Sequence, residues 1–179
     1  STRVRSSAAS DVYKRQRQYC GVMELVADGV TYYFLDNEYY FKREGQYGYF
    51  DDGERYAFFS KAALSVLPLI GYIPTIIHCN DWQTALVPVY LKTLFRDEYF
   101  VNIRTVFTIH NIAYQGKYDP AILGDVFGLG EQSLSILSYD GCLNLMKGAI
   151  VCCDILSTVS PTYAEEIKTP EYSYGLHYI

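Results

Sequence analysis

Two runs of apolar, mostly β-branched residues with a helical segment between them dominate the middle of the chain. The runs cover Thr75–His78 and Arg104–Ile109, and the apolar spacing over 82–95 predicts a helix with a kink near its middle at Pro88. A strand, a helix and a strand within about 35 residues form a βαβ unit, whose strands are parallel and buried on both faces. The pattern therefore predicts an α/β fold.

A β-hairpin is predicted ahead of this unit. Val22–Ala27 and Val30–Leu35 are separated by Asp28-Gly29, a pair typical of type I′ turns because both of its residues tolerate positive φ. The tyrosine- and glycine-rich segment 38–50 follows, and its irregular pattern predicts a loop without a helix. An acidic start and apolar residues at helical spacing then predict a helix over 51–69.

The C-terminal third shows a mixed pattern. Short helical turns are expected around Ala121–Leu123, and Cys142–Cys153 has the composition of a buried helix. Ile155–Val159 predicts a strand. Ser160-Pro161 then opens a last helix to about Lys168, with proline at its first position.

Polar residues follow three of the predicted strands: Asp36-Asn37, His78 to Gln83, and His110-Asn111 with Tyr114 and Gln115. The carboxyl ends of parallel strands share one edge of a sheet, and ligands of open α/β sheets bind there. We therefore expect these residues to meet at one pocket. Asn80 or Asp81 is also expected to cap the next helix, and packing or capping alone remains an alternative for His78 and Asp81.

Other kinds of site are weakly supported. His78, Asp81 and His110 are residue types that bind metals, but the Gly-Asn-His-Asp/Glu pattern of binuclear phosphoesterases is absent. No Gly-x-Gly-x-x-Gly follows a strand, and neither a Walker loop nor Gly-x-Ser-x-Gly occurs. Sugar or nucleotide binding remains, without a diagnostic motif.

Composition narrows the class of protein. The 179 residues suit one domain, and the net charge of −5 without a basic stripe argues against nucleic acid as a partner. No apolar run approaches the roughly 20 residues of a membrane helix, so no membrane partner is expected. Five cysteines without a repeated spacing favour reduced thiols and a cytoplasmic location. The 19 tyrosines suit stacking on sugars or nucleotides, although simple packing is an alternative for each.

The first 18 residues differ from the rest of the chain. They carry five positive charges and one negative charge and follow neither strand nor helix periodicity. A disordered tail, or one that is foreign to the protein, is expected over 1–18, and a basic arm is the functional alternative. The folded domain is expected over 19–179.

Five collinear segments resemble the N-terminal domain of bacterial glycogen synthases and plant starch synthases. They are 34–45, 49–60, 78–86, 107–116 and 158–167. The resemblance implies a Rossmann-like three-layer domain with a mostly parallel sheet, the N-terminal half of a two-domain GT-B glycosyltransferase. It also implies retaining transfer of glucose from an ADP-glucose donor to the non-reducing end of an α-1,4-glucan acceptor, with no metal and no other cofactor.

The resemblance also suggests individual roles. His110 matches the family's active-site histidine, and the substrate-binding candidates are Asn111, Asp81, Trp82, Gln83, Tyr114 and Asp36. The family's Lys-x-Gly-Gly-Leu loop and its second domain have no match, so we expect a partial catalytic domain that is inactive alone. A noncatalytic glucan-binding module that uses the tyrosine-rich loop Tyr39–Tyr49 is the alternative.

Overall fold

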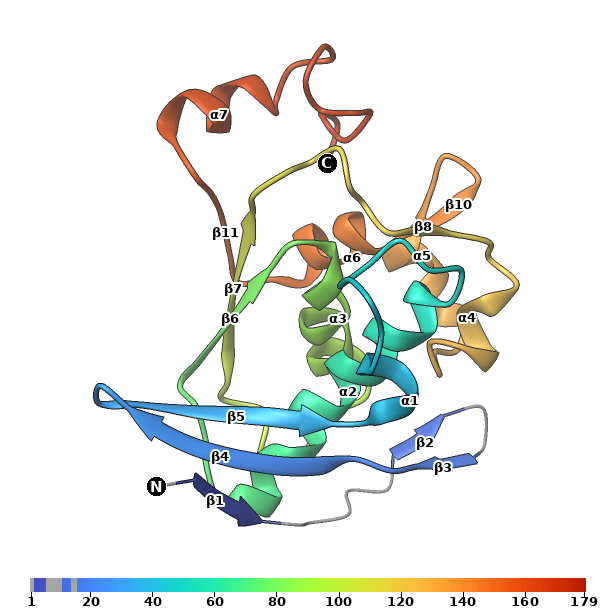
Figure 1. Cartoon of the computed structure of the whole chain (residues 1–179). Coiled ribbons are helices and arrows are strands. Elements are labelled where there is room, and N and C mark those ends of the chain that lie inside the picture. The colour runs from blue at the N-terminus through green and yellow to red at the C-terminus, as the bar shows by residue number, and fades with distance from the viewer. Residues whose placement is uncertain (1, 6–10, 14–15) are drawn as a thin grey trace.

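The predicted βαβ unit is part of a three-stranded parallel sheet in the structure, a computed structural model that describes residues 2–5, 11–13 and 16–179. Its strands β6 (Ile76–Asn80), β7 (Arg104–Ile109) and β11 (Ile155–Thr158) follow the order β11-β7-β6. Both neighbouring pairs are parallel, and the sheet is seen edge-on in Figure 1. The predicted α/β fold and its βαβ unit are confirmed.

The connection from β6 to β7 consists of two helical pieces. The 3-10 helix η1 (Trp82–Thr84) is followed by α3 (Leu86–Thr93). Pro88 is thus the third residue of α3, in the first turn, where its missing N–H has no helical partner to lose. The predicted kink in the middle of one long helix is therefore wrong. The break lies instead at Ala85, whose N–H donates to the Trp82 carbonyl at 3.2 Å.

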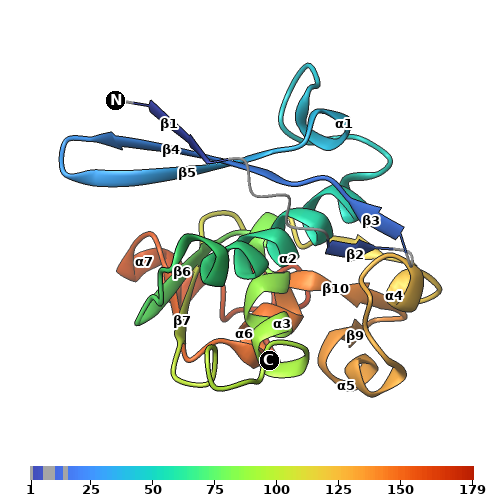
Figure 2. The same cartoon turned by 90° about the horizontal axis from the view of Figure 1, so that it is seen from below.

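Helices cover one side of this sheet. In Figures 1 and 2, α2 (Asp52–Ile70), α3 and α6 (Leu145–Cys152) lie together on that side, and α3 contacts both of the others. The outer strands are less enclosed than predicted: only Cys79 of β6 is buried, and Ile155 and Leu156 of β11 are exposed. The expectation of burial on both faces is wrong for these strands, since each lies at an edge of the described sheet.

A separate antiparallel sheet packs next to α2. It joins β4 (Gly21–Ala27) and β5 (Val30–Asp36) to β1 (Thr2–Arg5), in the order β1-β4-β5. The turn residues Asp28 and Gly29 have φ of 51° and 77°, which confirms the predicted hairpin and its turn.

The tail predicted over residues 1–18 lies partly outside the described residues, which omit 1, 6–10 and 14–15. Its described parts form β1, β2 (Asp11–Tyr13) and β3 (Gln16–Gln18), and β2 pairs with β3. The domain boundary near residue 18 stays a prediction.

A short helix, α1 (Glu38–Phe41), begins the segment that was predicted to lack helices. Asn37 caps it: the side-chain oxygen accepts a hydrogen bond from Tyr40 N at 2.9 Å. The Tyr40 ring is fully buried against Phe58 of α2, with ring centroids 4.8 Å apart. The prediction of an irregular loop is thus wrong over 38–41. The helix predicted over 51–69 is confirmed as α2, which ends at Gly71 in the left-handed conformation.

The remaining elements are short and follow the predictions with shifted ends. Cys142–Cys153 splits into strand β10 and helix α6, whereas the last helix, α7 (Pro161–Glu166), begins at Ser160-Pro161 as predicted. The others are β8 (Lys117–Tyr118), α4 (Ile122–Asp125), η2 (Glu131–Ser133), α5 (Leu134–Leu137), β9 (Ser138–Tyr139) and β10 (Cys142–Asn144).

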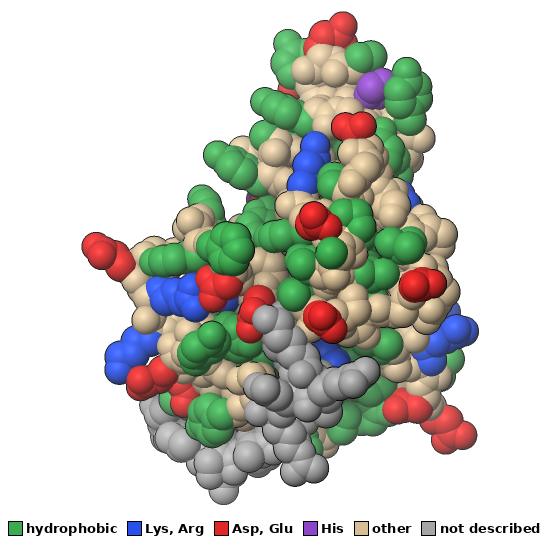
Figure 3. Space-filling model, turned by 90° about the vertical axis from the view of Figure 1, so that its right-hand side faces the viewer, with side chains coloured by type: hydrophobic (Ala, Val, Ile, Leu, Met, Phe, Trp, Pro, Cys, Tyr) green, Lys and Arg blue, Asp and Glu red, His purple; other side chains and the backbone are tan. Residues whose placement is uncertain are grey.

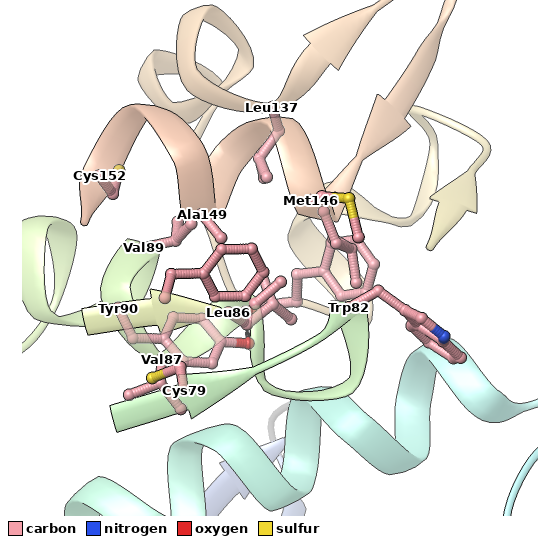
Figure 4. Packing of buried hydrophobic residues seen from close by; sticks show 14 of the residues in the cluster. Cys79, Trp82, Leu86, Val87, Val89, Tyr90, Leu137, Met146, Ala149 and Cys152 are labelled. Atoms are coloured by element: carbon pink, nitrogen blue, oxygen red, sulfur yellow. Dashed lines mark hydrogen bonds between the residues drawn. The ribbon is translucent and has the colours of Figure 1, made fainter. Parts of the chain in front are cut away.

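Two clusters of buried apolar side chains stabilise these layers. The larger one joins α3, α6 and the inner face of the parallel sheet, and Figure 4 shows Trp82 at its margin, next to α2. The smaller one joins α2 to the antiparallel sheet through Val22, Tyr40 and Phe58. Among the described residues, no helix is long and apolar enough to cross a membrane.

Candidate functional site

The ends of β6 and β7 are joined by the side chain of Asp81. Its Oδ1 accepts hydrogen bonds from the backbone N–H of His110 at 2.8 Å and of Asn111 at 3.3 Å. The side chain of His110 makes a second contact between the two strand ends: its Nε2 lies 2.9 Å from Oδ1 of Asn80, the last residue of β6. The predicted meeting of the His78–Gln83 and His110–Asn111 segments at one sheet edge is confirmed.

Asp81 adopts an unusual backbone conformation at this junction. Its φ is 57° and its ψ is 179°, in a region that residues with a Cβ rarely enter. Asp81 precedes η1, as the capping prediction required, but its side chain makes no capping hydrogen bond. That part of the prediction is wrong, because the carboxylate is turned to the neighbouring strand end.

The bond between His110 and Asn80 defines which ring nitrogen remains available. An amide oxygen accepts hydrogen bonds and donates none, so the Nε2 that faces it carries a proton. In the neutral imidazole, Nδ1 is then the nitrogen that accepts a hydrogen bond from a ligand hydroxyl. His110 is exposed, which leaves this nitrogen accessible.

The loop after β7 is anchored to the beginning of α6. Gln115 is buried; its Nε2 donates to the carbonyl oxygen of Ile112 at 3.1 Å, and its Oε1 accepts from Asn144 Nδ2 at 2.7 Å. Asn111 Oδ1 accepts from Ala113 N at 3.0 Å, which tightens the turn. These bonds hold Asn111 and Tyr114 in place while Tyr114 stays exposed.

A hollow of about 300 Å³ lies beside this junction. Its lining includes five of the predicted site residues: Asp81, Trp82, Gln83, Asn111 and Tyr114. We call it the Asp81 hollow. His110 lies next to it through its contact with Asp81 and is not among the lining residues.

Two further residues complete the lining of the Asp81 hollow, Gln46 and Tyr47 from the loop 42–50. Sequence reasoning identified the segment 38–50 as aromatic and suited to sugars and named Tyr47 as a residue that could stack on a glucan, but it did not name Gln46 and placed neither residue beside Asp81. Neither residue follows a predicted strand, so the sequence gives no signal that they belong to the site. Tyr47 and Tyr114 line the same hollow only because of the way the chain folds.

Trp82 contributes less to the Asp81 hollow than predicted. It is 8% exposed, and its ring packs edge-on against Tyr56 of α2 and also meets Tyr118, with centroids 5.0 and 6.4 Å away. Gly116 allows this packing, since a Cβ there would lie 2.9 Å from the indole. Trp82 is mainly a core residue that closes the inner side of the hollow.

Asp36 lies apart from the other predicted site residues. It ends β5, which belongs to the antiparallel sheet, and its Oδ2 accepts a hydrogen bond from Tyr19 OH at 3.3 Å. It lines neither the Asp81 hollow nor a second, adjoining hollow of about 760 Å³ that lies between α2 and β5. The expectation that all three polar strand ends share one sheet edge is therefore wrong for Asp36, because its strand joins a different sheet.

A metal centre has little support in the geometry. In the described part of the chain, no three His, Cys, Asp or Glu residues are grouped to hold an ion. His78, one of the three residues considered, instead places Nε2 2.6 Å from the Thr108 hydroxyl. The groups gathered here, a carboxylate, amides, an imidazole and tyrosine hydroxyls, are ones that can exchange hydrogen bonds with a hydroxyl-rich ligand.

Comparison with known proteins identifies one family. A model of the starch synthase catalytic domain matches residues 2–179. The chain is 52% identical over 160 residues to a glycogen synthase of Geobacillus stearothermophilus, and this match covers 88% of the chain and 33% of that protein. It is 49% identical over 168 residues to a glycogen synthase of Clostridium botulinum (strain Alaska E43 / Type E3), which covers 92% and 35%.

A solved structure agrees with this assignment. The catalytic domain of starch synthase IV from Arabidopsis thaliana, bound to ADP and acarbose, superposes with a TM-score of 0.89 at 33% identity. The match covers 99% of this chain and 38% of that one. The chain thus spans about a third of the length of the curated relatives that it matches.

Proposed function

Because the chain belongs to the starch synthase catalytic domain family, we propose that it is the N-terminal part of a GT-B glucosyltransferase that elongates an α-1,4-glucan. The donor is ADP-glucose and the acceptor is the non-reducing end of glycogen or starch. The observation that carries the proposal is the junction of Asp81 and His110 beside a hollow lined with amide and hydroxyl groups. The relative solved with ADP and acarbose supports the choice of both ligands.

The junction suggests how the residues divide the work. Asp81 fixes the backbone of His110, and Nδ1 of the His110 ring accepts a hydrogen bond from a hydroxyl of the transferred glucose. Asn111, Gln83 and Tyr114 offer the hydrogen bonds that orient a sugar in the Asp81 hollow. A retaining transfer develops positive charge on the sugar ring, and the carboxylate of Asp81 favours that charge.

The proposal also covers the extent of the folded unit and the location of the protein. The folded unit is 19–179, and the chain contributes one wall of a cleft, so that it does not transfer glucose by itself. We place the protein in the cytoplasm. The support for this location is the number and spacing of the five cysteines, an odd number without a repeated spacing, which favour reduced thiols.

A noncatalytic glucan-binding module is the second candidate, and burial weakens it. It relies on tyrosines of the loop 39–49, but Tyr40 is fully buried and presents no ring face to a sugar. Tyr39 is 69% exposed but lines neither hollow, whereas Tyr47 lines both. Of these three tyrosines, Tyr47 is thus the one placed to contact a glucan, and it lies at the Asp81 hollow, where a catalytic site and a binding site coincide.

Transfer of labelled glucose from ADP-glucose to glycogen tests the proposal. We expect no transfer by the chain alone, and transfer when it is joined to the remaining two thirds of the Geobacillus stearothermophilus relative. His110→Ala in the joined protein should lower kcat by about 100-fold or more, as loss of a strong transition-state contact does. Tyr39→Ala is the matched control and should leave kcat unchanged.

Two results would contradict the proposal. One is a joined protein that folds, as judged by circular dichroism, but transfers no glucose. The other is full activity in the His110→Ala variant. A binding measurement on the chain alone gives an independent check: maltose should bind, and Tyr114→Ala should weaken it.

A further inference from the structure

Thr84, the last residue of η1, places its hydroxyl against the turn that joins β6 to η1. Its Oγ1 accepts a hydrogen bond from the backbone N–H of Asn80 at 2.7 Å. It donates to the carbonyl oxygen of Asn80 at 2.8 Å, and the carbonyl oxygen of Asp81 is a second, longer acceptor at 3.3 Å. One hydroxyl thus contacts both of the peptide groups that flank Asp81.

The orientation of these two peptide groups defines the backbone conformation of Asp81. The peptide before Asp81 sets φ; Thr84 holds its carbonyl oxygen, and the carbonyl oxygen of Thr108 accepts from its N–H at 3.0 Å. The peptide after Asp81 sets ψ, and its carbonyl oxygen also accepts from the backbone N–H of Thr84 at 3.1 Å. A residue with a Cβ keeps a φ of 57° and a ψ of 179° only where its surroundings enforce them. Thr84 supplies part of that constraint.

This backbone conformation decides what the carboxylate of Asp81 can reach. An aspartate in front of a helical turn ordinarily caps it, by accepting a hydrogen bond from a backbone N–H of the first turn. Here the carboxylate makes no such bond and is turned to the end of β7, where Oδ1 accepts from the N–H groups of His110 and Asn111. The conformation that Thr84 holds is therefore the one in which Asp81 fixes the backbone of His110.

A second route leads from Thr84 to the ring of His110. Thr84 holds the backbone of Asn80 at both its N–H and its carbonyl oxygen. The side-chain oxygen of Asn80 in turn faces Nε2 of His110 at 2.9 Å. The backbone and the ring of His110 are thus each one residue removed from Thr84, the backbone through Asp81 and the ring through Asn80.

Hydrogen bonds, and not charge pairs, maintain this arrangement. Among the residues that the structure describes, neither Asp81 nor His110 takes part in an ion pair. Figure 3 shows one face of the molecule with acidic and basic side chains interspersed, without a block of one sign. That face therefore adds no strong field that would orient a polar side chain.

We propose that Thr84 is a positioning residue of the candidate site: its hydroxyl keeps Asp81 and Asn80 in the conformations that orient the backbone and the ring of His110. Thr84 is not among the residues that line the Asp81 hollow, so it acts through these neighbours. The effect on catalysis rests on the proposed function. The positioning itself is a property of the chain alone and can be measured without activity.

Hydrogen exchange of single backbone amides, followed by NMR on the chain alone, tests the positioning. Thr84→Val keeps the branched shape and removes the hydroxyl, whereas Thr84→Ser keeps the hydroxyl. In Thr84→Val the amide of His110 should exchange about threefold to tenfold faster, the effect of losing one supporting hydrogen bond, and in Thr84→Ser it should exchange as in wild type. The amide of Thr105 is the internal control, because it donates to the carboxylate of Asp154 at 2.8 Å at the other end of β7 and should not change.

Kinetics of the joined protein test the consequence for catalysis. Thr84→Val should lower kcat by about tenfold and keep KM for the glucan within about twofold, because the hydroxyl positions His110 and touches no substrate. Thr84→Ser should keep kcat. In the His110→Ala background, Thr84→Val should lower the residual kcat by less than about twofold, since the residue through which it acts is gone.

Thr93→Val is the matched control for the kinetics. The hydroxyl of Thr93 also donates to a backbone carbonyl oxygen, that of Val89 at 2.8 Å, but it does so within α3 and away from the candidate site. Its removal should leave kcat unchanged. Circular dichroism establishes folding for each variant.

The outcomes separate the inference from the proposed function. Unchanged exchange at His110 in a folded Thr84→Val chain overturns the inference, whether or not the joined protein transfers glucose. Equally faster exchange at Thr105 shows a general loss of stability and overturns it too. A joined protein without transfer overturns the proposed function, and the exchange data still decide the positioning. A loss of kcat that Thr84→Ser shares, or that persists in full without His110, overturns the route through His110.

Discussion

Substitution of Asp81 tests whether its carboxylate joins the two strand ends and compensates for an unfavourable backbone. The φ of 57° and ψ of 179° lie in a region occupied almost only by glycine, at a cost of about 1–3 kcal/mol for other residues. The Oδ1 bonds to His110 and Asn111 act against this cost. The variants Asp81→Ala, Asp81→Gly and Asp81→Asn separate the two contributions.

Asp81→Ala keeps the unfavourable backbone and removes the charged acceptor. The 2.8 Å bond to His110 alone is worth about 1.5–3 kcal/mol, the range for hydrogen bonds to charged groups. Asp81→Gly loses the same bond but adopts the backbone freely, which returns about 1–3 kcal/mol and costs about 0.5–1 kcal/mol in chain entropy. The glycine variant should therefore be more stable than the alanine variant by about 1 kcal/mol, the reverse of the usual order.

Urea unfolding followed by far-UV circular dichroism measures these differences. Asp81→Asn keeps an acceptor oxygen and a residue type that tolerates positive φ, so it should lie between wild type and Asp81→Ala. An alanine variant as stable as wild type would show that the carboxylate contributes nothing. An alanine variant more stable than the glycine variant would refute the argument from backbone conformation.

Three other measurements test separate parts of the structure. Burial raises the pKa of the Cys79 thiol to about 12, and the nearby Cys153 raises it further. Iodoacetamide at pH 8 should therefore modify Cys79 only in urea. Rapid labelling of Cys79 in the native chain would contradict its burial. Gly116→Ala should lower the midpoint of thermal unfolding more than Gly29→Ala. Both glycines have positive φ, but only at Gly116 would a Cβ contact core side chains. Equal effects would show that the neighbouring side chains move aside to make room for the Cβ. Hydrogen bonds from Arg43 hold the pKa of Asp51 below its ordinary value of 3.8, so the pair stabilises the fold above that pH. Asp51→Asn should cost up to about 1 kcal/mol at pH 7, and the difference from wild type should fade as the pH falls below 3.8 in urea titrations at each pH.

The elements with a strong local signal were predictable from the sequence. The β-branched runs of β6 and β7 and the Asp28-Gly29 turn each specify their structure through nearby residues. The same holds for the meeting of Asp81 and His110, because parallel strands joined by a helix end at the same edge. The family resemblance and its fold are confirmed by the comparisons.

The failures have a common cause, which is long-range packing that no short segment encodes. Asp36 follows a strand as His110 does, but the sequence does not say that β5 pairs only within the antiparallel sheet. Residues 38–41 form a helix because Asn37 caps them and Tyr40 packs on Phe58, although the local pattern of aromatics favours strands. Gln46 and Tyr47 reach the Asp81 hollow only through the folding of their loop onto α2.

Trp82 is the chain's single tryptophan, and its position has a practical consequence. The indole separates the interior from the candidate sugar site and touches tyrosines on two other elements. Its intrinsic fluorescence is therefore a built-in reporter: one emission band responds both to an occupant beside Asn111 and to opening of the interior. Titrations with sugars and unfolding experiments can be followed on the unlabelled chain, without introducing a probe.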